Sequence, residues 1–292
     1  IFFRLSSEMA LNPNAYMAAL CFLLGTSIVL VFLLPTDHGY YVSHPWSLPV
    51  YIAAHLLAIN GVLVCVYHHR WTHALTSSLL GSGMGFSVAM AARQPQPWGM
   101  FWTYPAVLAF FHWSEYMAMC WCQPDNVTWN SFVINHSVAY GVAHGAAFVE
   151  AIVSFTFLPW MKVKPVYFAG LACIIGGEML RKTSMYQASV SFTHEVQFIR
   201  RPEHVLVTTG VYALVRHPSY VGWFWWSIGT QVMLCNPICA VAFALASWNF
   251  FNKRIQVEEQ MLVHFFGLEY RHYQRRVRIG LPFISGFPEI EQ

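Results

Sequence analysis

Residues 216–222, RHPSYVG, combine polar side chains with the backbone signals of a helix start. Pro218 disfavours a helical conformation at His217, so a helix can begin at or just after the proline. Ser219 would then lie at a helix N-terminus, where free backbone N–H groups favour an anion or a carboxylate. The motif is compatible with an anion-binding turn, and equally with an ordinary turn at which the chain enters a membrane.

A second polar group follows in RIQVEE at 254–259. Arg254 and Glu258 are four residues apart and therefore share one helix face. An ordinary exposed ion pair on a helix would show the same spacing. The turn signal at 236–237, Asn-Pro, separates two apolar runs and predicts a tight helical hairpin. The hairpin would return residues 254–258 to the RHPSYVG turn. We therefore expect five side chains to meet at one membrane surface: Tyr212, His217, Tyr220, Arg254 and Glu258.

Three other carboxylates, Glu115, Glu150 and Glu178, lie within or near apolar runs, where charged residues are candidate functional groups. Glu178 has Arg181 and Lys182 about one helical turn away, close enough for an ion pair on the same helix. For all three carboxylates we favour structural roles over catalysis.

Metal chemistry is not expected, although the chain has 14 histidines. His69 and His73 form an HxxxH pair on one helix face, but a membrane di-iron enzyme needs several such boxes. The glycines of GSGMG at 81–85 resemble a nucleotide loop only superficially, because they lie inside an apolar run. The spacing of Gly81 and Gly85 is typical of close helix packing in membranes.

The composition indicates what kind of scaffold positions these groups. Of 292 residues, 57% are hydrophobic and only 10% are charged, against about 25% charged in an average soluble domain. This excludes a soluble enzyme and a disordered chain, and the net charge of +3 is too small to suggest nucleic-acid binding. We expect an all-α, polytopic integral membrane protein with a C-terminal helical hairpin and a cytosolic cofactor pocket.

Apolar runs long enough to cross a membrane predict about eight transmembrane helices. They cover residues 15–34, 46–67, 74–92, 98–122, 131–160, 165–180, 219–235 and 237–251. Nine of the 16 Lys and Arg residues lie between 200 and 278, which favours a cytosolic C-terminus. This orientation leaves Lys162 on the opposite side, against the same rule. We divide the chain into membrane helices at 1–187 and a catalytic region at 188–292.

At these motifs the chain resembles the isoprenylcysteine carboxyl methyltransferase family, membrane enzymes that finish CaaX processing. The resemblance is carried by LVTTGVYALVRHPSYVGWFWWSIGTQVMLCNPIC (206–239), Glu258-Glu259, HFFGLEY (264–270) and GLPFI (280–284). It continues more weakly through GGEMLRK (176–182), NHS (135–137) and HWSEY (112–116). The RHPxYxG turn alone also occurs in phospholipid methyltransferases and NADPH-dependent sterol reductases.

The resemblance implies methylation of the C-terminal carboxylate of a prenylated cysteine, with S-adenosylmethionine (SAM) as donor and no metal. The expected substrates are prenylated CaaX proteins such as Ras-family GTPases, and the expected place is the endoplasmic reticulum membrane, among its lipids, with the active site facing the cytosol. Arg254 is expected to bind the substrate carboxylate, and Arg254 and Glu258 to be the catalytic residues. The expected SAM contacts are Gln197, His204, Val205, Leu206, Val207, Tyr212, His217, Pro218, Ser219, Tyr220 and Glu258.

Other functions remain open at this point. A phospholipid N-methyltransferase would use the same donor on an amine, whereas Arg254 favours an anion. An NADPH-dependent sterol reductase would bind NADPH and ignore SAM. A membrane scaffold or transporter would leave the converging polar residues without a use. The carboxylate acceptor itself needs no general base, because its reference pKa near 3.5 keeps it ionised at pH 7.

Overall fold

The computed structural model describes residues 12–33, 47–135 and 137–288. Within these ranges the regular secondary structure is helical, apart from one isolated bridge between Val215 and Arg278, which confirms the all-α part of the predicted fold class. The chain forms two compact units, Ile1–Ile134 and Asn135–Gln292, each described by itself below. The residues of the predicted site all belong to the second unit.

The first unit packs its helices around α4. Its α-helices are α1 (Pro13–Thr26), α3 (Ser47–Val66), α4 (Trp71–Arg93), α5 (Trp98–Phe101) and α6 (Thr103–Cys122). Short 3-10 segments at Ser27–Leu33, His68–Arg70, Pro124–Asn126 and Trp129–Phe132 extend or connect them. A Cβ atom on Gly81 would lie 2.1 Å from the Phe22 carbonyl oxygen, and one on Gly85 would lie 2.6 Å from that of Thr26. These glycines therefore let the α4 backbone touch α1 and its extension, which confirms their predicted packing role.

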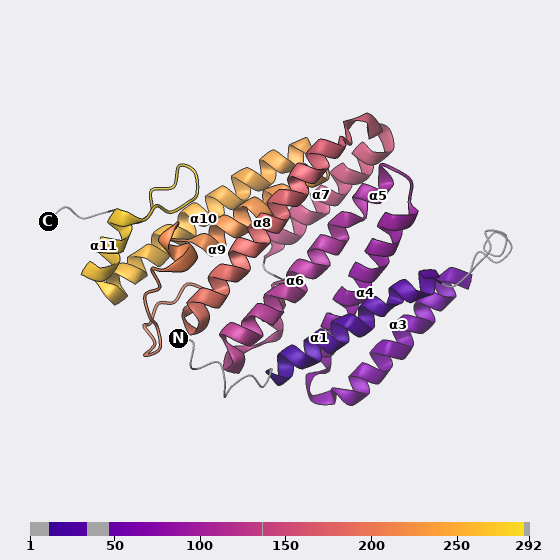
Figure 1. Ribbon diagram of the computed structural model, residues 1–292, viewed down its shortest axis with the longest axis horizontal. Helices are drawn as coiled ribbons and strands as arrows, with labels where there is room; N and C mark the ends of the chain where they lie inside the picture. Colours follow the sequence, from indigo (N-terminus) through magenta and orange to yellow (C-terminus); the bar gives the residue numbers. More distant parts are fainter. Residues whose placement is uncertain (1–11, 34–46, 136, 289–292) are drawn as a thin grey trace. The chain divides into compact units, whose positions relative to one another are not determined.

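The second unit contains the predicted helical hairpin (Figure 1). Its α-helices are α7 (Val138–Phe157), α8 (Lys164–Ala188), α9 (Pro218–Met233), α10 (Pro237–Phe266) and α11 (Leu268–Arg276), with 3-10 turns at Pro159–Met161, Ser189–Ser191 and Gly210–Ala213. Helices α8 and α9 pack backbone to backbone. A Cβ on Gly177 would lie 2.5 Å from the Gly222 carbonyl oxygen, and one on Gly222 would lie 2.6 Å from that of Gly177.

The junction between α9 and α10 is capped from both sides. The Glu150 carboxylate of α7 accepts hydrogen bonds from the backbone N–H groups of Ile238 (2.9 Å) and Cys239 (2.7 Å), at the start of α10. The Lys162 ammonium, in a side chain that is only 8% exposed, donates to the carbonyl oxygen of Leu234 at 2.7 Å, beyond the end of α9. Glu150 thus has the predicted structural role. Lys162 is a buried cap and not an exposed charge in a loop. It therefore does not count among the loop charges that the positive-inside rule uses to predict membrane orientation.

Four described helical segments, rather than eight, are long and apolar enough to cross a membrane: Pro13–Phe32, Ser47–Val66, His68–Arg93 and Val138–Phe157. The predicted number of spans is wrong by this measure. The other four predicted runs do form helices, but α9 has only 16 residues and the remaining three carry polar or charged side chains. Many of those side chains, such as Glu115 in α6 and Arg181 in α8, are buried within the protein.

The chain after α10 turns back on the hairpin. Gly267, with φ +54°, separates α10 from α11. We call residues 277–288 the C-terminal tail. Its apolar side chains Ile279, Leu281 and Ile284 share one core with residues of α9 and α10. The indole N–H of Trp248, midway along α10, donates to the Pro282 carbonyl oxygen at 2.8 Å.

Candidate active site

A pocket lies among the start of α9, the last turns of α10, α11 and the connector 188–207. It holds about 920 Å³ of empty space, part of it open to solvent. All eleven residues expected to contact SAM line this pocket: Gln197, His204, Val205, Leu206, Val207, Tyr212, His217, Pro218, Ser219, Tyr220 and Glu258. The structure therefore brings together residues spread from Gln197 to Glu258 in the sequence.

The connector forms one wall of the pocket and is tied down by arginines. Arg201 donates to Nε2 of His204 at 3.0 Å, so this nitrogen is the acceptor and the proton of the neutral ring is on Nδ1. Burial, followed by the charge of Arg201, lowers the pKa of His204, which is therefore neutral at pH 7. Arg200 donates to the Phe265 carbonyl oxygen at 2.8 Å and lies 4.7 Å from the centre of the Phe266 ring.

The RHPSYVG turn begins α9 at Pro218, as predicted. The His217 ring is 5% exposed and stacks on the Tyr220 ring, with centroids 5.5 Å apart and planes 3° from parallel. Ser219 accepts a hydrogen bond from Arg181 Nη1 at 2.7 Å. Arg181 is 2% exposed, so α8 adds a buried cation to a helix N-terminus that already favours anions.

Arg181 is a site residue whose importance the sequence did not reveal. It was predicted as an ion-pair partner of Glu178, and Lys182 does make that pair at 3.2 Å. The guanidinium of Arg181 also lies 4.7 Å from the centre of the Trp223 ring. The signal that could have identified it is its position one turn after Gly177, where α8 meets α9.

Arg254 and Glu258 meet the turn through one phenol. Arg254 Nε donates to the Tyr220 hydroxyl at 2.8 Å, and that hydroxyl donates to Glu258 Oε2. Glu258 Oε1 lies 3.7 Å from His217 Nδ1. Among the described residues, Arg254 does not itself line the pocket. It contacts Tyr220, which does. Four of the five side chains predicted to meet are therefore joined by contacts, and the fifth, Tyr212, lines the same pocket.

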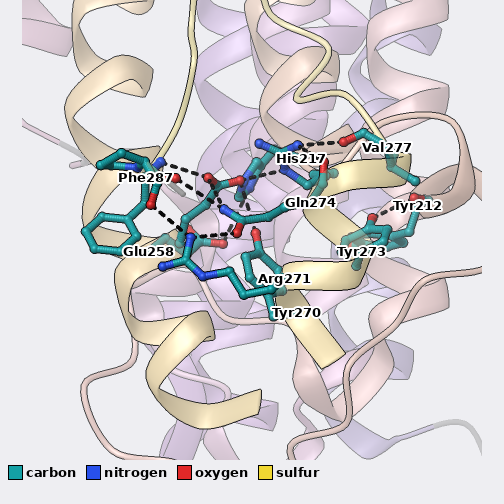
Figure 2. Close-up of polar contacts among 12 residues, drawn as sticks. Tyr212, His217, Glu258, Tyr270, Arg271, Tyr273, Gln274, Val277 and Phe287 are labelled. Atoms are coloured by element: carbon teal, nitrogen blue, oxygen red, sulfur yellow. Dashed lines mark hydrogen bonds and ion pairs between the residues drawn. The ribbon is translucent and has the colours of Figure 1, made fainter. Parts of the chain in front are cut away.

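The neighbouring carboxylate, Glu259, is fully buried and has a role that the sequence did not reveal. It accepts five hydrogen bonds, whose donors are Arg216 Nε (2.7 Å), His217 Nε2 (3.1 Å), the Tyr270 hydroxyl (3.1 Å), Gln274 Nε2 (3.1 Å) and the Phe287 backbone N–H (2.9 Å). Burial alone would raise the pKa of Glu259, but its contacts with His217 and Arg216 outweigh burial and lower the pKa to about 2. Figure 2 shows Tyr270, Gln274 and Phe287 approaching the side of the turn that carries His217.

Consecutive residues on a helix point about 100° apart, so Glu258 and Glu259 serve different neighbours. Glu258 faces the pocket, whereas Glu259 faces α11 and the tail. Helix α11 also supports the pocket directly, because the Tyr273 hydroxyl donates to the Tyr212 carbonyl oxygen at 2.6 Å. Among the described residues, no group of three or more His, Cys, Asp and Glu side chains is placed to hold a metal ion.

Comparison with known proteins identifies the family to which the chain is similar. Residues 170–264 match the model of the isoprenylcysteine carboxyl methyltransferase (ICMT) family. Protein-S-isoprenylcysteine O-methyltransferases of Rattus norvegicus and Homo sapiens are 42% and 41% identical to the chain, over 94% of its length and 95% of theirs. A solved structure described as the eukaryotic intramembrane Ras methyltransferase ICMT, without a monobody, matches with a TM-score of 0.89. It is 38% identical and the match covers 95% of this chain and 100% of that one.

The protein is therefore a membrane methyltransferase, with a helical fold, apolar helices and a pocket beside the RHPSYVG turn. Its described residues form no β-sheet of the kind on which soluble methyltransferases commonly bind their nucleotide-like donor. The chain belongs to the isoprenylcysteine carboxyl methyltransferase family. The family resemblance and the predicted enzyme class are confirmed.

Proposed function

We propose that the protein transfers a methyl group from SAM to the C-terminal carboxylate of a prenylated cysteine, on CaaX proteins such as Ras-family GTPases. The observation that carries this proposal is the arrangement of Arg254, Tyr220 and Glu258 beside the pocket. The Arg254 guanidinium suits an anionic acceptor, whereas an amine acceptor would favour a carboxylate or an aromatic cage at that position.

The pocket fits SAM chemically. Its walls include the apolar residues Leu206, Leu262 and Phe265, which suit a nucleoside, and the Glu258 carboxylate, which suits a cationic group. Bound SAM would supply a methyl group on a sulfonium. The expected contacts are the eleven lining residues already named, with Glu258 holding a polar or cationic part of the molecule.

The chain's own contribution is alignment. The acceptor carboxylate is ionised at neutral pH and needs no base. Arg254 would aim it with a forked donor whose orientation is fixed by the bond to Tyr220. Glu258 is fixed by the same hydroxyl, so one phenol sets the relative positions of the groups for donor and acceptor. Orientation of this kind can contribute roughly 7–11 kcal/mol to a reaction between two bound molecules.

The two substrates suggest two entrances. A farnesyl or geranylgeranyl chain would reach the site from the lipid, and SAM would enter from water. We place the enzyme in the endoplasmic reticulum membrane, as the family resemblance implies. The pocket and the C-terminus would face the cytosol, because the basic residues concentrate in the C-terminal third.

The direct test is methyl transfer from radiolabelled SAM to N-acetyl-S-farnesylcysteine by the purified protein in lipid. Base-labile label on the acceptor is expected. Label on phosphatidylethanolamine instead, or NADPH oxidation with a sterol and no SAM binding, would favour the two alternative enzymes.

The role of Arg254 has its own test. Arg254→Ala is expected to abolish transfer but retain SAM binding, because the predicted SAM contacts lie on other residues. Lys253→Ala, at the exposed neighbouring position, is the matched control and is expected to remain active. Full activity in Arg254→Ala would show that the acceptor carboxylate is held elsewhere.

A further inference from the structure

The two oxygens of the Glu259 carboxylate face different parts of the protein. Oε1 accepts from Arg216, His217 and Tyr270, so it is bound to the catalytic turn and to α11. Oε2 accepts from Gln274 and from the Phe287 backbone N–H, so it is bound to α11 and to the C-terminal tail. One buried carboxylate therefore connects the tail to the residues that begin α9.

The contact with Glu259 determines the orientation of the His217 ring and places a proton on its Nε2 atom. An ionised carboxylate can only accept hydrogen bonds, so His217 Nε2 must carry its proton toward Glu259. The other ring nitrogen, Nδ1, faces Glu258 Oε1, 3.7 Å away, beyond normal hydrogen-bond distance. Because His217 lines the pocket, the ring orientation that it offers to a bound molecule depends on Glu259.

The tail is held against Glu259 by specific contacts. Arg271 Nη1 donates to the Pro288 carbonyl oxygen at 2.9 Å, and its guanidinium lies 5.4 Å from the centre of the Phe287 ring. Gly286, with φ +74°, brings the backbone so close that a Cβ would lie 2.2 Å from Glu259 Oε2. The approach therefore requires glycine. Figure 2 shows Arg271, Gln274 and Phe287 gathered at this contact.

We propose that Glu259 is a positioning residue that couples docking of the C-terminal tail to the orientation of His217, so that tight binding of SAM requires a docked tail. The proposal rests on the proposed use of the pocket for SAM. If the tail leaves, Oε2 loses its backbone donor, and a buried carboxylate with unfilled acceptor sites tends to rearrange toward new donors. The turn residues bound to Oε1 are then no longer held in one geometry.

The first experiment uses the reciprocity of coupled equilibria: if docking promotes SAM binding, SAM must promote docking. Ser285 is exposed and directly precedes Gly286, so a spin label on Ser285→Cys reports the mobility of the segment that contacts Glu259, beyond the tail residues that pack in the core. The exposed cysteines, Cys65 and Cys173, are first replaced by alanine. Saturating SAM is expected to reduce the mobility of the label, and the same addition to a Glu259→Gln version is expected to have no such effect.

The second experiment removes docking while leaving every charged group in place. Gly286→Ala is expected to release the tail label and to raise the Kd of radiolabelled SAM by about 5–150-fold, the usual range for coupling between two sites. Gly176→Ala is the matched control, since a Cβ on Gly176 meets nothing within 4 Å, and it is expected to leave both measurements unchanged.

The outcomes separate this proposal from the proposed function. If the folded wild-type protein does not bind SAM, the function is wrong. If it binds SAM normally, the coupling is overturned by any one of three results. These are a wild-type label that does not respond to SAM, a Gly286→Ala tail as immobile as the wild type, and a SAM Kd in Gly286→Ala within twofold of wild type.

Discussion

The Tyr220 hydroxyl is the smallest group whose removal should impair catalysis. Tyr220→Phe deletes one oxygen that accepts from Arg254 and donates to Glu258, while it retains the ring that stacks on His217 and Phe251. The substitution therefore removes the bridge between the two candidate catalytic side chains and little else.

The magnitude follows from the two bonds that are lost. A hydrogen bond to a charged group contributes about 1.5–3 kcal/mol. The two losses should not add, because Arg254 and Glu258 are four residues apart on α10 and can pair directly without the hydroxyl. We expect a net loss near one bond, about 1.5–3 kcal/mol, which lowers kcat/KM by roughly 10–150-fold.

The assay is transfer of the labelled methyl group to N-acetyl-S-farnesylcysteine, with both substrates varied. Tyr16→Phe, on an exposed residue of α1, is the control for loss of a tyrosine hydroxyl and should behave as wild type. If Tyr220→Phe kept more than half of the wild-type kcat/KM, the bridge would not be what aligns Arg254 and Glu258.

Three further changes test the scaffold. Gly177→Ala should lower the stability of the purified protein by about 1–3 kcal/mol, because its Cβ would meet the α9 backbone at 2.5 Å. Gly176→Ala should leave the stability unchanged, since a Cβ there meets nothing within 4 Å. Equal melting temperatures for the two variants would contradict the close packing. Lys162→Met should cost about 1–3 kcal/mol by leaving buried carbonyl groups beyond the end of α9 uncapped, and the exposed Lys164→Met should be neutral when both are measured by thermal unfolding. The pKa of Glu259, about 2 against an ordinary 4.5, means that its ionised form contributes stability in full above about pH 4.5 and loses it as the pH falls toward 2. Melting temperatures should therefore fall more steeply with acidification in the wild type than in Glu259→Gln, and parallel pH profiles would count against this assignment.

The sequence predicted the hairpin and the groups that it brings together because those features depend on local signals. Pro218 and Pro237 set the starts of α9 and α10, and the short turn between the helices makes their return antiparallel. The spacing of Arg254 and Glu258 then decides which face of α10 meets the turn. Which of these groups bind SAM or substrate was implied by family resemblance, and those roles stay predictions.

The contacts of Glu259 could not be predicted in the same way. They depend on where the chain goes after Gly267, since α11 supplies Tyr270 and Gln274 and the tail supplies Phe287. Nothing local in the sequence fixes those returns. The error in the number of spans has a related cause. Hydropathy counts each residue as though it met lipid, whereas residues such as Arg181 are buried against other helices.

The capped junction at the start of α10 makes the length of this helix a fixed distance within the protein. From Pro237 to Arg254 the helix rises about 26 Å, at about 1.5 Å per residue, which is close to the ~30 Å hydrocarbon thickness of a bilayer. Glu150 and Lys162 fix one end of that length in the protein interior. Because an α-helix is stiff, the capped junction sets the position of Arg254 from about 26 Å away. If Arg254 binds the acceptor carboxylate as proposed, the length of α10 determines where the protein holds that carboxylate.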